Sequence, residues 1–185
     1  MKINRLTPPM SEREVRKLRA GGVVSITGKI VTARDKAYAR AISGTKLPVK
    51  LQGGVVYHCG PLAKRTPSGW KILSAGPTTS ARMDPVQAEF VKLTGVRALV
   101  GKGGVGGEVA DQLARLGCIY LAFPGGAGAL AAKSIEKIER VFWEDLGDAE
   151  ALWVLDVRDF GPLVVAIDTK GNNLYLREVR NQKKT

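Results

Sequence analysis

The sequence predicts a layered α/β domain. Apolar runs typical of buried strands alternate with stretches that have the periodicity of amphipathic helices, and part of this alternation has β-α-β order. The chain has 185 residues, of which 44% are apolar and 25% are charged, both ordinary values for a folded domain. We therefore expect residues 1–185 to form a single domain with a sizeable core.

The first elements follow from local patterns. Ser11 and Glu14 have the spacing of a capping box, which predicts a short helix that ends at Ala20, before a pair of glycines. Apolar residues then alternate with Ser, Thr and Lys over 24–30, the period-two pattern of a strand. A second helix is expected over 32–41.

Two short strands are expected in the middle of the chain, over 55–57 and 70–73, followed by a strong helix start. Asp84 is expected to be the N-cap and Pro85 the first helical residue, because these residue types favour those positions. The helix should stop at Gly95, since glycine tolerates the conformation that ends helices. Its apolar face is expected to carry Val86, Phe90 and Leu93.

The later region continues as strand, glycine-rich turn, helix and strand. The strands are expected over 96–100 and 118–123, and the helix over 108–116, with Gly117 as its C-cap. A short alanine-rich helix follows. The remaining strands are expected over 141–143, 153–157, 163–167 and 174–179, with a hairpin turn at 170–173 and a frayed end at 181–185.

Composition weighs against several protein classes. No run of about 18 apolar residues is present, so no membrane span is expected. The stretch 1–6 lacks the apolar core of a signal peptide. Cys59 and Cys118 are too few for a disulfide framework or a four-ligand metal cluster. A reducing, cytoplasmic setting is the simplest expectation.

The formal charge of +12 is uneven, with 12 Lys and Arg against 3 Asp and Glu in residues 1–50. Such a basic region can attract nucleic acid, an acidic partner chain or anionic substrates. Only 6% of residues are aromatic, and the basic stretches lack interleaved aromatic residues for base stacking. The charge keeps a nucleic-acid-binding module as an alternative function, but the sequence has no nucleic-acid recognition motif that supports it.

The segment 76–84 combines three hydroxyl side chains, Thr78, Thr79 and Ser80, with the guanidinium of Arg82 just before a predicted helix. Free N–H groups and the helix dipole add positive potential there, so the segment suits a small anion. Gly-Pro-Thr-Thr-Ser is also ordinary turn chemistry, in which hydroxyls bond their own backbone. This segment alone does not decide between the two interpretations.

A second loop, 101–107, places Lys102 among glycines between a predicted strand and a predicted helix. Gly101, Gly103 and Gly106 match the dinucleotide-binding spacing, but the next strand ends at Phe123 instead of at an acidic residue that would hold a ribose. A nucleotide site is therefore poorly supported. A turn that binds nothing is the plain alternative.

Taken together, these motifs resemble the β subunit of class I, iron–sulfur fumarases and of the related two-subunit L-tartrate dehydratases. The resemblance covers nearly the whole chain. The matching motifs are GKIVTARD at 28–35, YHCGP at 57–61, GPTTSARM at 76–83, GKGG at 101–104, FPGGA at 123–127, WVL at 153–155 and DTKG at 168–171.

The resemblance implies a β/β/α swivelling domain that closes over a separate α subunit. It implies a hydro-lyase that adds water to, or removes it from, a dicarboxylic acid, with fumarate hydration as the leading candidate and L-tartrate dehydration as the alternative. It also implies a 4Fe-4S cluster whose cysteine ligands lie on the α subunit, so this chain itself is expected to bind no metal.

By the same resemblance, Thr78 corresponds to the catalytic base, and Arg34, Arg82 and Lys102 correspond to substrate-binding residues. A dianion needs at least two cations around it, and arginine can hold a carboxylate through two parallel N–H bonds. Nearby cations would also favour the alkoxide form of a hydroxyl that acts as a base. Three alternatives stay open: Thr79 or Ser80 as the base, and Arg40 in place of Arg34.

Overall fold

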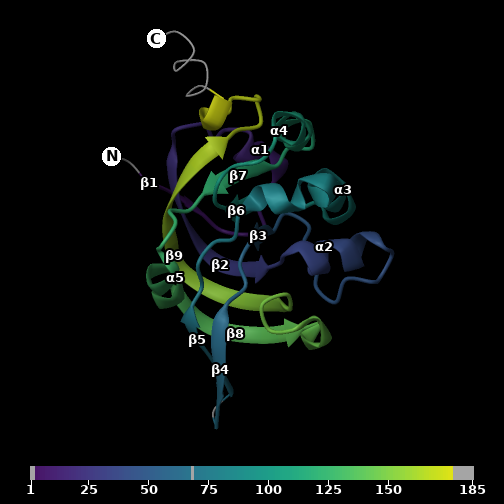
Figure 1. Cartoon of the computed structure of the whole chain (residues 1–185). Helices are drawn as coiled ribbons and strands as arrows, with labels where there is room; N and C mark the ends of the chain where they lie inside the picture. The colour runs from purple at the N-terminus through teal and green to yellow at the C-terminus, as the bar shows by residue number, and fades with distance from the viewer. Residues whose placement is uncertain (1–2, 68, 177–185) are drawn as a thin grey trace.

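The computed structural model describes residues 3–67 and 69–176 (Figure 1). A seven-stranded mixed sheet has the order β1-β2-β3-β6-β7-β9-β8, and β4 and β5 form a separate two-stranded hairpin. The strands are β1 (Ile3–Leu6), β2 (Val23–Thr32), β3 (Val55–Tyr57), β4 (Leu62–Thr66), β5 (Gly69–Ser74), β6 (Ala98–Gly101), β7 (Ile119–Ala122), β8 (Ile135–Phe142) and β9 (Leu152–Ile167). The helices are α1 (Glu12–Val15), α2 (Asp35–Ile42), α3 (Asp84–Thr94), α4 (Gly107–Arg115) and α5 (Gly128–Lys133), with 3₁₀ turns at Ser80–Met83 and Glu144–Leu146.

The parallel strands β3, β6 and β7 are buried on both faces and separate two apolar cores. Along them, side chains alternate between the cores, as expected for a period of two residues. Helices α2, α3 and α4 cover one face, where Val56, Leu99 and Tyr120 point (Figure 1). On the other face, β9 contributes more buried core residues than any other element, and β2 adds Val24, Ile26 and Ile30. The expected mixed α/β class is confirmed.

Strand β9 closes this arrangement into a ring, because it pairs with β2, β7 and β8. The sequence predicted two strands here, over 153–157 and 163–167, and this prediction was wrong. Asp159 and Gly161 have positive φ angles of 47° and 151°, and the β2–β9 register shifts opposite them. The turn-forming residues therefore produce bulges within one 16-residue strand, without ending it.

Several predicted boundaries also differ. The capping box at Ser11 is present, but α1 ends at Val15, after a single turn, and does not reach Ala20. Helix α2 starts at Asp35, since Thr32 is still paired with Tyr57 in the sheet. Strand β4 was not predicted, and β8 is longer than the expected 141–143.

The expected hairpin at the end of the chain is also wrong in part. The turn at 170–173 exists, but 174–176 is helical, so no strand starts there. The reason is local: the Asp168 carboxylate accepts hydrogen bonds from the N–H groups of Lys170 and Asn172, which curls the chain away from the ladder. Residues 177–179 of that predicted strand and the frayed end at 181–185 lie outside the described residues.

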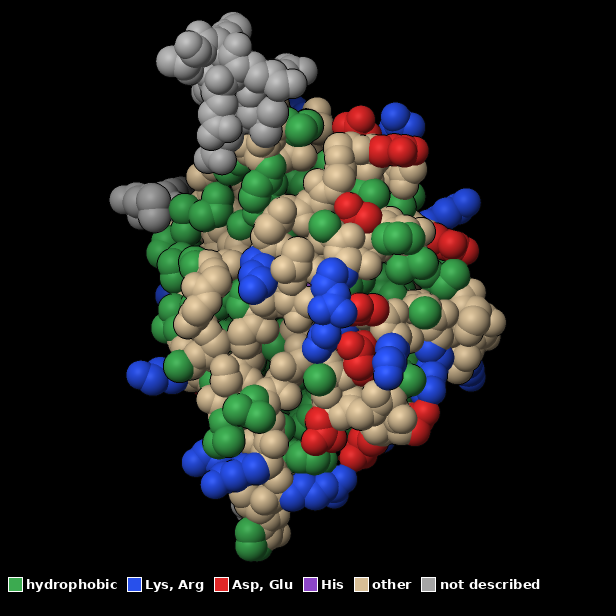
Figure 2. Space-filling view, viewed as in Figure 1, with side chains coloured by type: hydrophobic (Ala, Val, Ile, Leu, Met, Phe, Trp, Pro, Cys, Tyr) green, Lys and Arg blue, Asp and Glu red, His purple; other side chains and the backbone are tan. Residues whose placement is uncertain are grey.

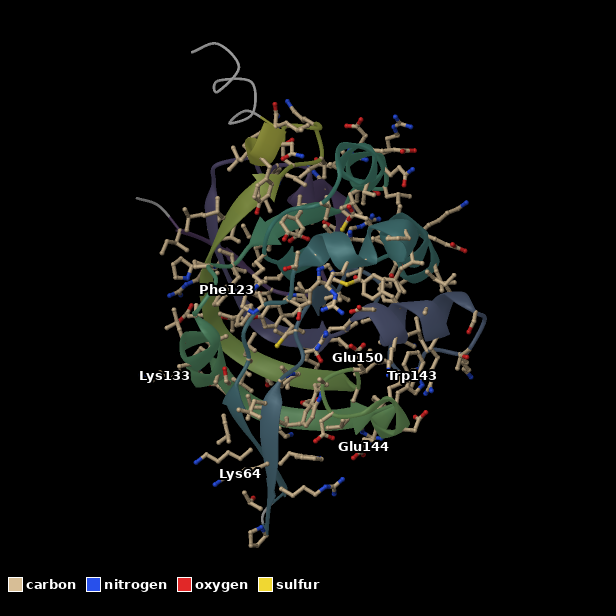
Figure 3. The ribbon with its side chains drawn as sticks, in the orientation of Figure 1. Lys64, Phe123, Lys133, Trp143, Glu144 and Glu150 are labelled. Carbon is tan, nitrogen blue, oxygen red and sulfur yellow. The ribbon has the colours of Figure 1, made fainter. Side chains whose placement is uncertain are left out.

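The β4–β5 hairpin projects from the rest of the domain, at the bottom of Figure 1. Trp70 and Ile72 face the core, while Leu62 and Leu73 are exposed. Lys64, which Figure 3 labels, lies on this arm. None of the helices in the described ranges has the length and apolar character that crossing a membrane requires.

Candidate functional site

The two loops that the sequence singled out lie side by side. The Thr78 N–H donates to the carbonyl of His58 at 2.6 Å, and the Lys102 N–H donates to the carbonyl of Thr78 at 3.3 Å. The Ser80 N–H donates to the Lys102 carbonyl at 3.0 Å, which makes a bridge between Thr79 and Lys102. The structure therefore brings Thr78 and Lys102 together at the ends of β3 and β6, as predicted.

The three hydroxyl residues of the first loop have different surroundings. Thr78 is half-buried, and its hydroxyl makes no hydrogen bond to another described residue. Thr79 is exposed. Ser80 is fully buried, and its hydroxyl is hydrogen-bonded to Tyr120 and His58. Of the three, Thr78 combines partial burial with a hydroxyl that no neighbour occupies.

A chain of four buried polar side chains lies beneath this loop. The hydroxyl of Tyr38 is 2.7 Å from His58 Nε2, His58 Nδ1 is 2.7 Å from Ser80 Oγ, and the Tyr120 hydroxyl donates to Ser80 Oγ at 2.9 Å. We call these four residues the polar cluster. Burial lowers the pKa of His58 to about 3, only weakly opposed by Asp35, so its ring is neutral at ordinary pH.

The two candidate arginines meet at one carboxylate. Arg82 Nη2 lies 2.6 Å from Asp35 Oδ2, and Arg34 Nε lies 3.9 Å from Asp35 Oδ1 and 3.4 Å from Glu150 Oε1. Figure 2 shows basic and acidic side chains next to each other over the start of α2. The arginines differ in access, since the Arg34 side chain is 18% exposed and that of Arg82 is 52% exposed.

Backbone geometry fixes Arg34 in this place. It is the last residue before α2, and Gly60 leaves it room, because a Cβ there would lie 2.8 Å from Arg34 Nη1. Glu150, labelled in Figure 3, reaches the same helix start from the loop before β9 and accepts a hydrogen bond from the Lys36 N–H at 3.0 Å. Arg34 Nε is buried and has no hydrogen-bond partner among the described residues. This nitrogen therefore has an ion-pair partner in Glu150 but makes no well-directed hydrogen bond.

Lys102 is exposed and forms no ion pair with any described residue. The glycines around it are needed for close packing: Gly103 and Gly104 have positive φ angles of 76° and 74°, and a Cβ on Gly104 would lie 2.7 Å from the Tyr175 ring. The loop is thus filled by the chain's own side chains, which does not favour a nucleotide there.

Asp84 does not cap its own helix, so this prediction was wrong. Met83 is the N-cap residue, because the preceding 3₁₀ turn runs directly into α3, and Asp84 is the first helical residue. Its carboxylate accepts a hydrogen bond from the Gly106 N–H at 2.8 Å and so ties α3 to the loop of Lys102. Gly95 ends the helix in the left-handed conformation, as expected. Of the expected apolar face, Leu93 is exposed.

Arg40, the alternative to Arg34, lies elsewhere. Its guanidinium binds both carboxylate oxygens of Asp145, at 2.9 and 2.5 Å, and stacks over Trp143 at 5.4 Å. These contacts hold it at the far part of α2, away from the two loops. The structure therefore favours Arg34 of the two.

Sequence reasoning missed the partners of these candidates. Asp35 and Glu150 were not singled out, although an acidic residue directly after Arg34 is a visible signal for an ion pair. His58 entered only as part of the YHCGP motif, and Tyr120 was not considered. The contact between His58 and Ser80 could not be predicted, because no sequence pattern relates the end of a strand to a turn 22 residues later.

Comparisons with known proteins identify relatives that match most of the chain. Residues 1–178 match the family described as Fumarase C-terminus. The chain is 41% identical to the L(+)-tartrate dehydratase β subunit of Escherichia coli K12 over 170 residues, which cover 91% of this chain and 85% of that protein. A Methanocaldococcus jannaschii protein assigned as the same subunit is 44% identical over 171 residues, with 90% and 88% covered.

A longer relative comes from Geobacillus stearothermophilus and is assigned as a class I fumarate hydratase. It is 41% identical over 171 residues, which cover 92% of this chain but only 33% of that protein. A single chain can therefore contain this domain together with other parts. On the family match and these full-length similarities, the chain belongs to the fumarase C-terminal family, which includes the β subunits of L(+)-tartrate dehydratase.

Proposed function

We propose that the chain is the β subunit of a two-subunit hydro-lyase that adds water to, or removes it from, a four-carbon dicarboxylate. The observation that carries the proposal is the junction of the Thr78 and Lys102 loops, whose main chains are hydrogen-bonded to each other, so that a hydroxyl and an ammonium group come from adjoining loops. The relatives support it, because their names are those of a dehydratase β subunit and a hydratase.

In the proposed site, cations receive the two carboxylates of the substrate. Arg34, Arg82 and Lys102 supply three positive charges, and Asp35 and Glu150 remove two of them. One net positive charge remains before substrate binds, so a dianion gains from entering. Each charge-assisted hydrogen bond contributes roughly 1.5–3 kcal/mol net, which is enough for micromolar to millimolar binding after ordering costs.

Thr78 is the proposed base that takes the proton from the carbon beside a carboxylate. A hydroxyl does this poorly unless its surroundings favour the alkoxide. Its main chain is hydrogen-bonded on both sides, to His58 and Lys102, which fixes the backbone that carries the hydroxyl. Arg82, four residues further along the chain, and Lys102 would both stabilise negative charge on its oxygen.

The family resemblance implies a 4Fe-4S cluster, and this chain does not supply ligands for one. Cys59 and Cys118 belong to different apolar cores, and burial raises the pKa of each thiol to about 12, whereas metal binding requires thiolates. Within the described ranges, His, Cys, Asp and Glu form no group of three suited to a metal ion. We therefore assign the cluster to an α subunit.

Fumarate hydration to L-malate is the proposed reaction, in the cytoplasm, with a swivelling motion of this domain over the α subunit. L-tartrate dehydration is the second candidate. It is favoured by the similarity to tartrate dehydratase β subunits over most of their length. Both substrates are small dicarboxylates that the same cations would hold.

The test is anaerobic co-expression of this chain with the α-subunit gene of the same genome, followed by assays of fumarate hydration and L-tartrate dehydration. We expect turnover of one substrate by the complex and of neither by the chain alone. A complex that turns over neither dicarboxylate would overturn the proposal. Binding of this chain to DNA that persists at 0.5 M salt would favour a nucleic-acid-binding module instead, since purely electrostatic binding fades at that ionic strength.

A further inference from the structure

The polar cluster of Tyr38, His58, Ser80 and Tyr120 is fully buried, although the same space could hold apolar side chains. Tyr38 stacks on Phe90, and Tyr120 lies beside Leu99, so the surroundings are apolar. Replacing a buried polar group and its partner together by apolar groups is often neutral for stability. The cluster therefore calls for an explanation other than stability.

Two members of the cluster, Tyr38 and Ser80, lie on segments that also carry candidate site residues. Tyr38 lies one turn into α2, and its N–H donates to the carbonyl of Arg34 at 2.9 Å. Ser80 lies in the segment of Thr78 and Arg82, and its N–H donates to the carbonyl of Lys102. Arg34, Thr78 and Lys102 are thus each joined to a member of the cluster by a main-chain hydrogen bond. Arg82 lies two residues after Ser80.

His58 is the hub of these contacts. Its main-chain N–H donates to Val100 at 2.8 Å, its carbonyl accepts from Thr78 at 2.6 Å, and its two ring nitrogens contact Tyr38 and Ser80. One residue therefore joins α2, the Thr78 segment and the end of β6.

The missing side chain of Gly101 completes the arrangement. A Cβ at that position would overlap Ser80 Oγ and would lie 3.1 Å from His58 Nδ1 and 3.2 Å from the Tyr120 hydroxyl. The cluster therefore leaves no room for a side chain on the residue before Lys102. This close fit means that a shift of Ser80 or His58 would also move the main chain of Lys102.

We infer that His58 and Ser80 are positioning residues, which fix Thr78, Arg82 and Lys102 relative to one another and to Arg34 through the polar cluster. The inference rests on the proposed dicarboxylate site. Catalytic groups must be held within a fraction of an ångström, and misplacement by about 1 Å can lower the rate about a hundredfold. A hydrogen-bonded cluster sets such distances because each bond has a preferred length and direction.

The test compares Ser80→Ala with Thr94→Val in the αβ complex. Thr94 is a matched control, since its buried hydroxyl also makes two internal hydrogen bonds at the far end of α3: it donates to the carbonyl of Phe90 at 2.7 Å and accepts from the Val96 N–H at 3.5 Å. We expect both variants to lower the melting temperature, but only Ser80→Ala to lower kcat/KM, by about 10- to 100-fold. Equal kcat/KM in both variants of an active complex would show that the cluster only fills the core.

Two His58 variants sharpen the test. The amide of Asn reaches the place of Nδ1 and can keep the contact with Ser80, whereas the amide of Gln reaches the place of Nε2 and keeps the contact with Tyr38. We expect His58→Asn to retain more activity than His58→Gln, because Ser80 is the link to Thr78 and Lys102. The reverse order would contradict the assignment to Ser80. Tyr120→Phe, which keeps the ring, provides a milder variant if the others fail to fold.

Hydrogen exchange of the full-length chain gives a readout that does not depend on activity. The amides of Thr78, Ser80 and Lys102 are hydrogen-bonded in the two loops. We expect Ser80→Ala to speed their exchange relative to wild type and Thr94→Val to leave it unchanged. Unchanged exchange in Ser80→Ala would refute the positioning role. An inactive wild-type complex with this exchange pattern would count against the proposed reaction alone.

Discussion

Asp35 holds Arg82 by an ion pair of 2.6 Å between Oδ2 and Nη2. The guanidinium is half-exposed, so the pair itself contributes little to folding stability, about 0–1 kcal/mol. The ion pair matters because Asp35 competes with the substrate, since the same guanidinium is proposed to bind a substrate carboxylate. In this proposal, a carboxylate of the substrate would displace the Asp35 carboxylate from Arg82.

We therefore expect Asp35→Asn to lower the KM for the dicarboxylate several-fold, since the substrate no longer displaces a charged neighbour. Steady-state kinetics of the complex measure this, with Asp111→Asn, an exposed carboxylate on α4, as a control of equal charge change. A KM that rises tenfold instead would mean that Asp35 is needed to orient Arg82.

Thr78→Ala is expected to lower kcat by about 10²- to 10⁴-fold, the usual contribution of a general base, without loss of assembly with the α subunit. Thr78→Ser keeps the hydroxyl and should retain much of the activity. Thr79→Ala serves as the control, since Thr79 is exposed. Wild-type turnover in Thr78→Ala would remove this residue from the role of base.

Lys102→Met is expected to raise KM by about 10- to 100-fold with a smaller change in kcat, because the ammonium is proposed to bind substrate in both the ground and the transition state. The unbranched methionine keeps much of the apolar stem of lysine. Lys92→Met, at an exposed position of α3, controls for the loss of one charge. Unchanged kinetics in Lys102→Met would refute its role.

Gly101→Ala is expected to lower the free energy of unfolding by about 1–3 kcal/mol, because the added methyl overlaps Ser80 Oγ in a buried place. Gly125→Ala is the matched control, since a Cβ there meets no other atom within 4 Å. Urea titration of both variants measures the difference. Equal stability of the two would show that the loop relaxes without cost.

Asp168→Asn is expected to weaken the fold at neutral pH by about 1–3 kcal/mol, through loss of hydrogen bonds to a charged acceptor. Burial opposes ionisation of Asp168, but the N–H groups of Ala20, Lys170 and Asn172 and the Asn172 amide hold its pKa below the ordinary 3.8. The stabilisation is therefore fully present above pH 3.8 and is lost as the pH falls further. Urea titrations at pH 7 and pH 3 should show the wild-type advantage shrinking in acid, and an advantage that is independent of pH would contradict this account.

The parts of the fold that follow local rules could be predicted from the sequence. The capping box at Ser11, the left-handed end of α3 at Gly95 and the buried strands β3, β6 and β7 depend on residue type and spacing alone. The continuity of β9 could not be predicted, because whether Gly161 ends a strand or produces a bulge depends on the partner strand. That partner, β2, is distant in the sequence.

In the candidate site, too, some residues can be selected from the sequence, whereas their contacts depend on distant parts of the chain. Thr78, Arg82 and Lys102 could be selected from motifs, and their loops do meet. The contact of Glu150 with Arg34 depends on how α2 and the loop before β9 pack together. The contact between His58 and Ser80 depends on how the end of β3 meets the turn at Ser80–Met83. Asp84 illustrates the limit, since the residue type favoured a helix cap whereas the carboxylate instead binds Gly106 in another loop.

The ring closure by β9 has a consequence for synthesis of the protein. Translation adds residues at about 5–20 per second, N-terminal part first, so β2, β7 and β8 all leave the ribosome before the strand that pairs with each of them. Until then their unpaired edges are open to other nascent chains. Completion of the sheet therefore waits for β9, and we expect the chain to aggregate more readily at high expression because of this order of strands.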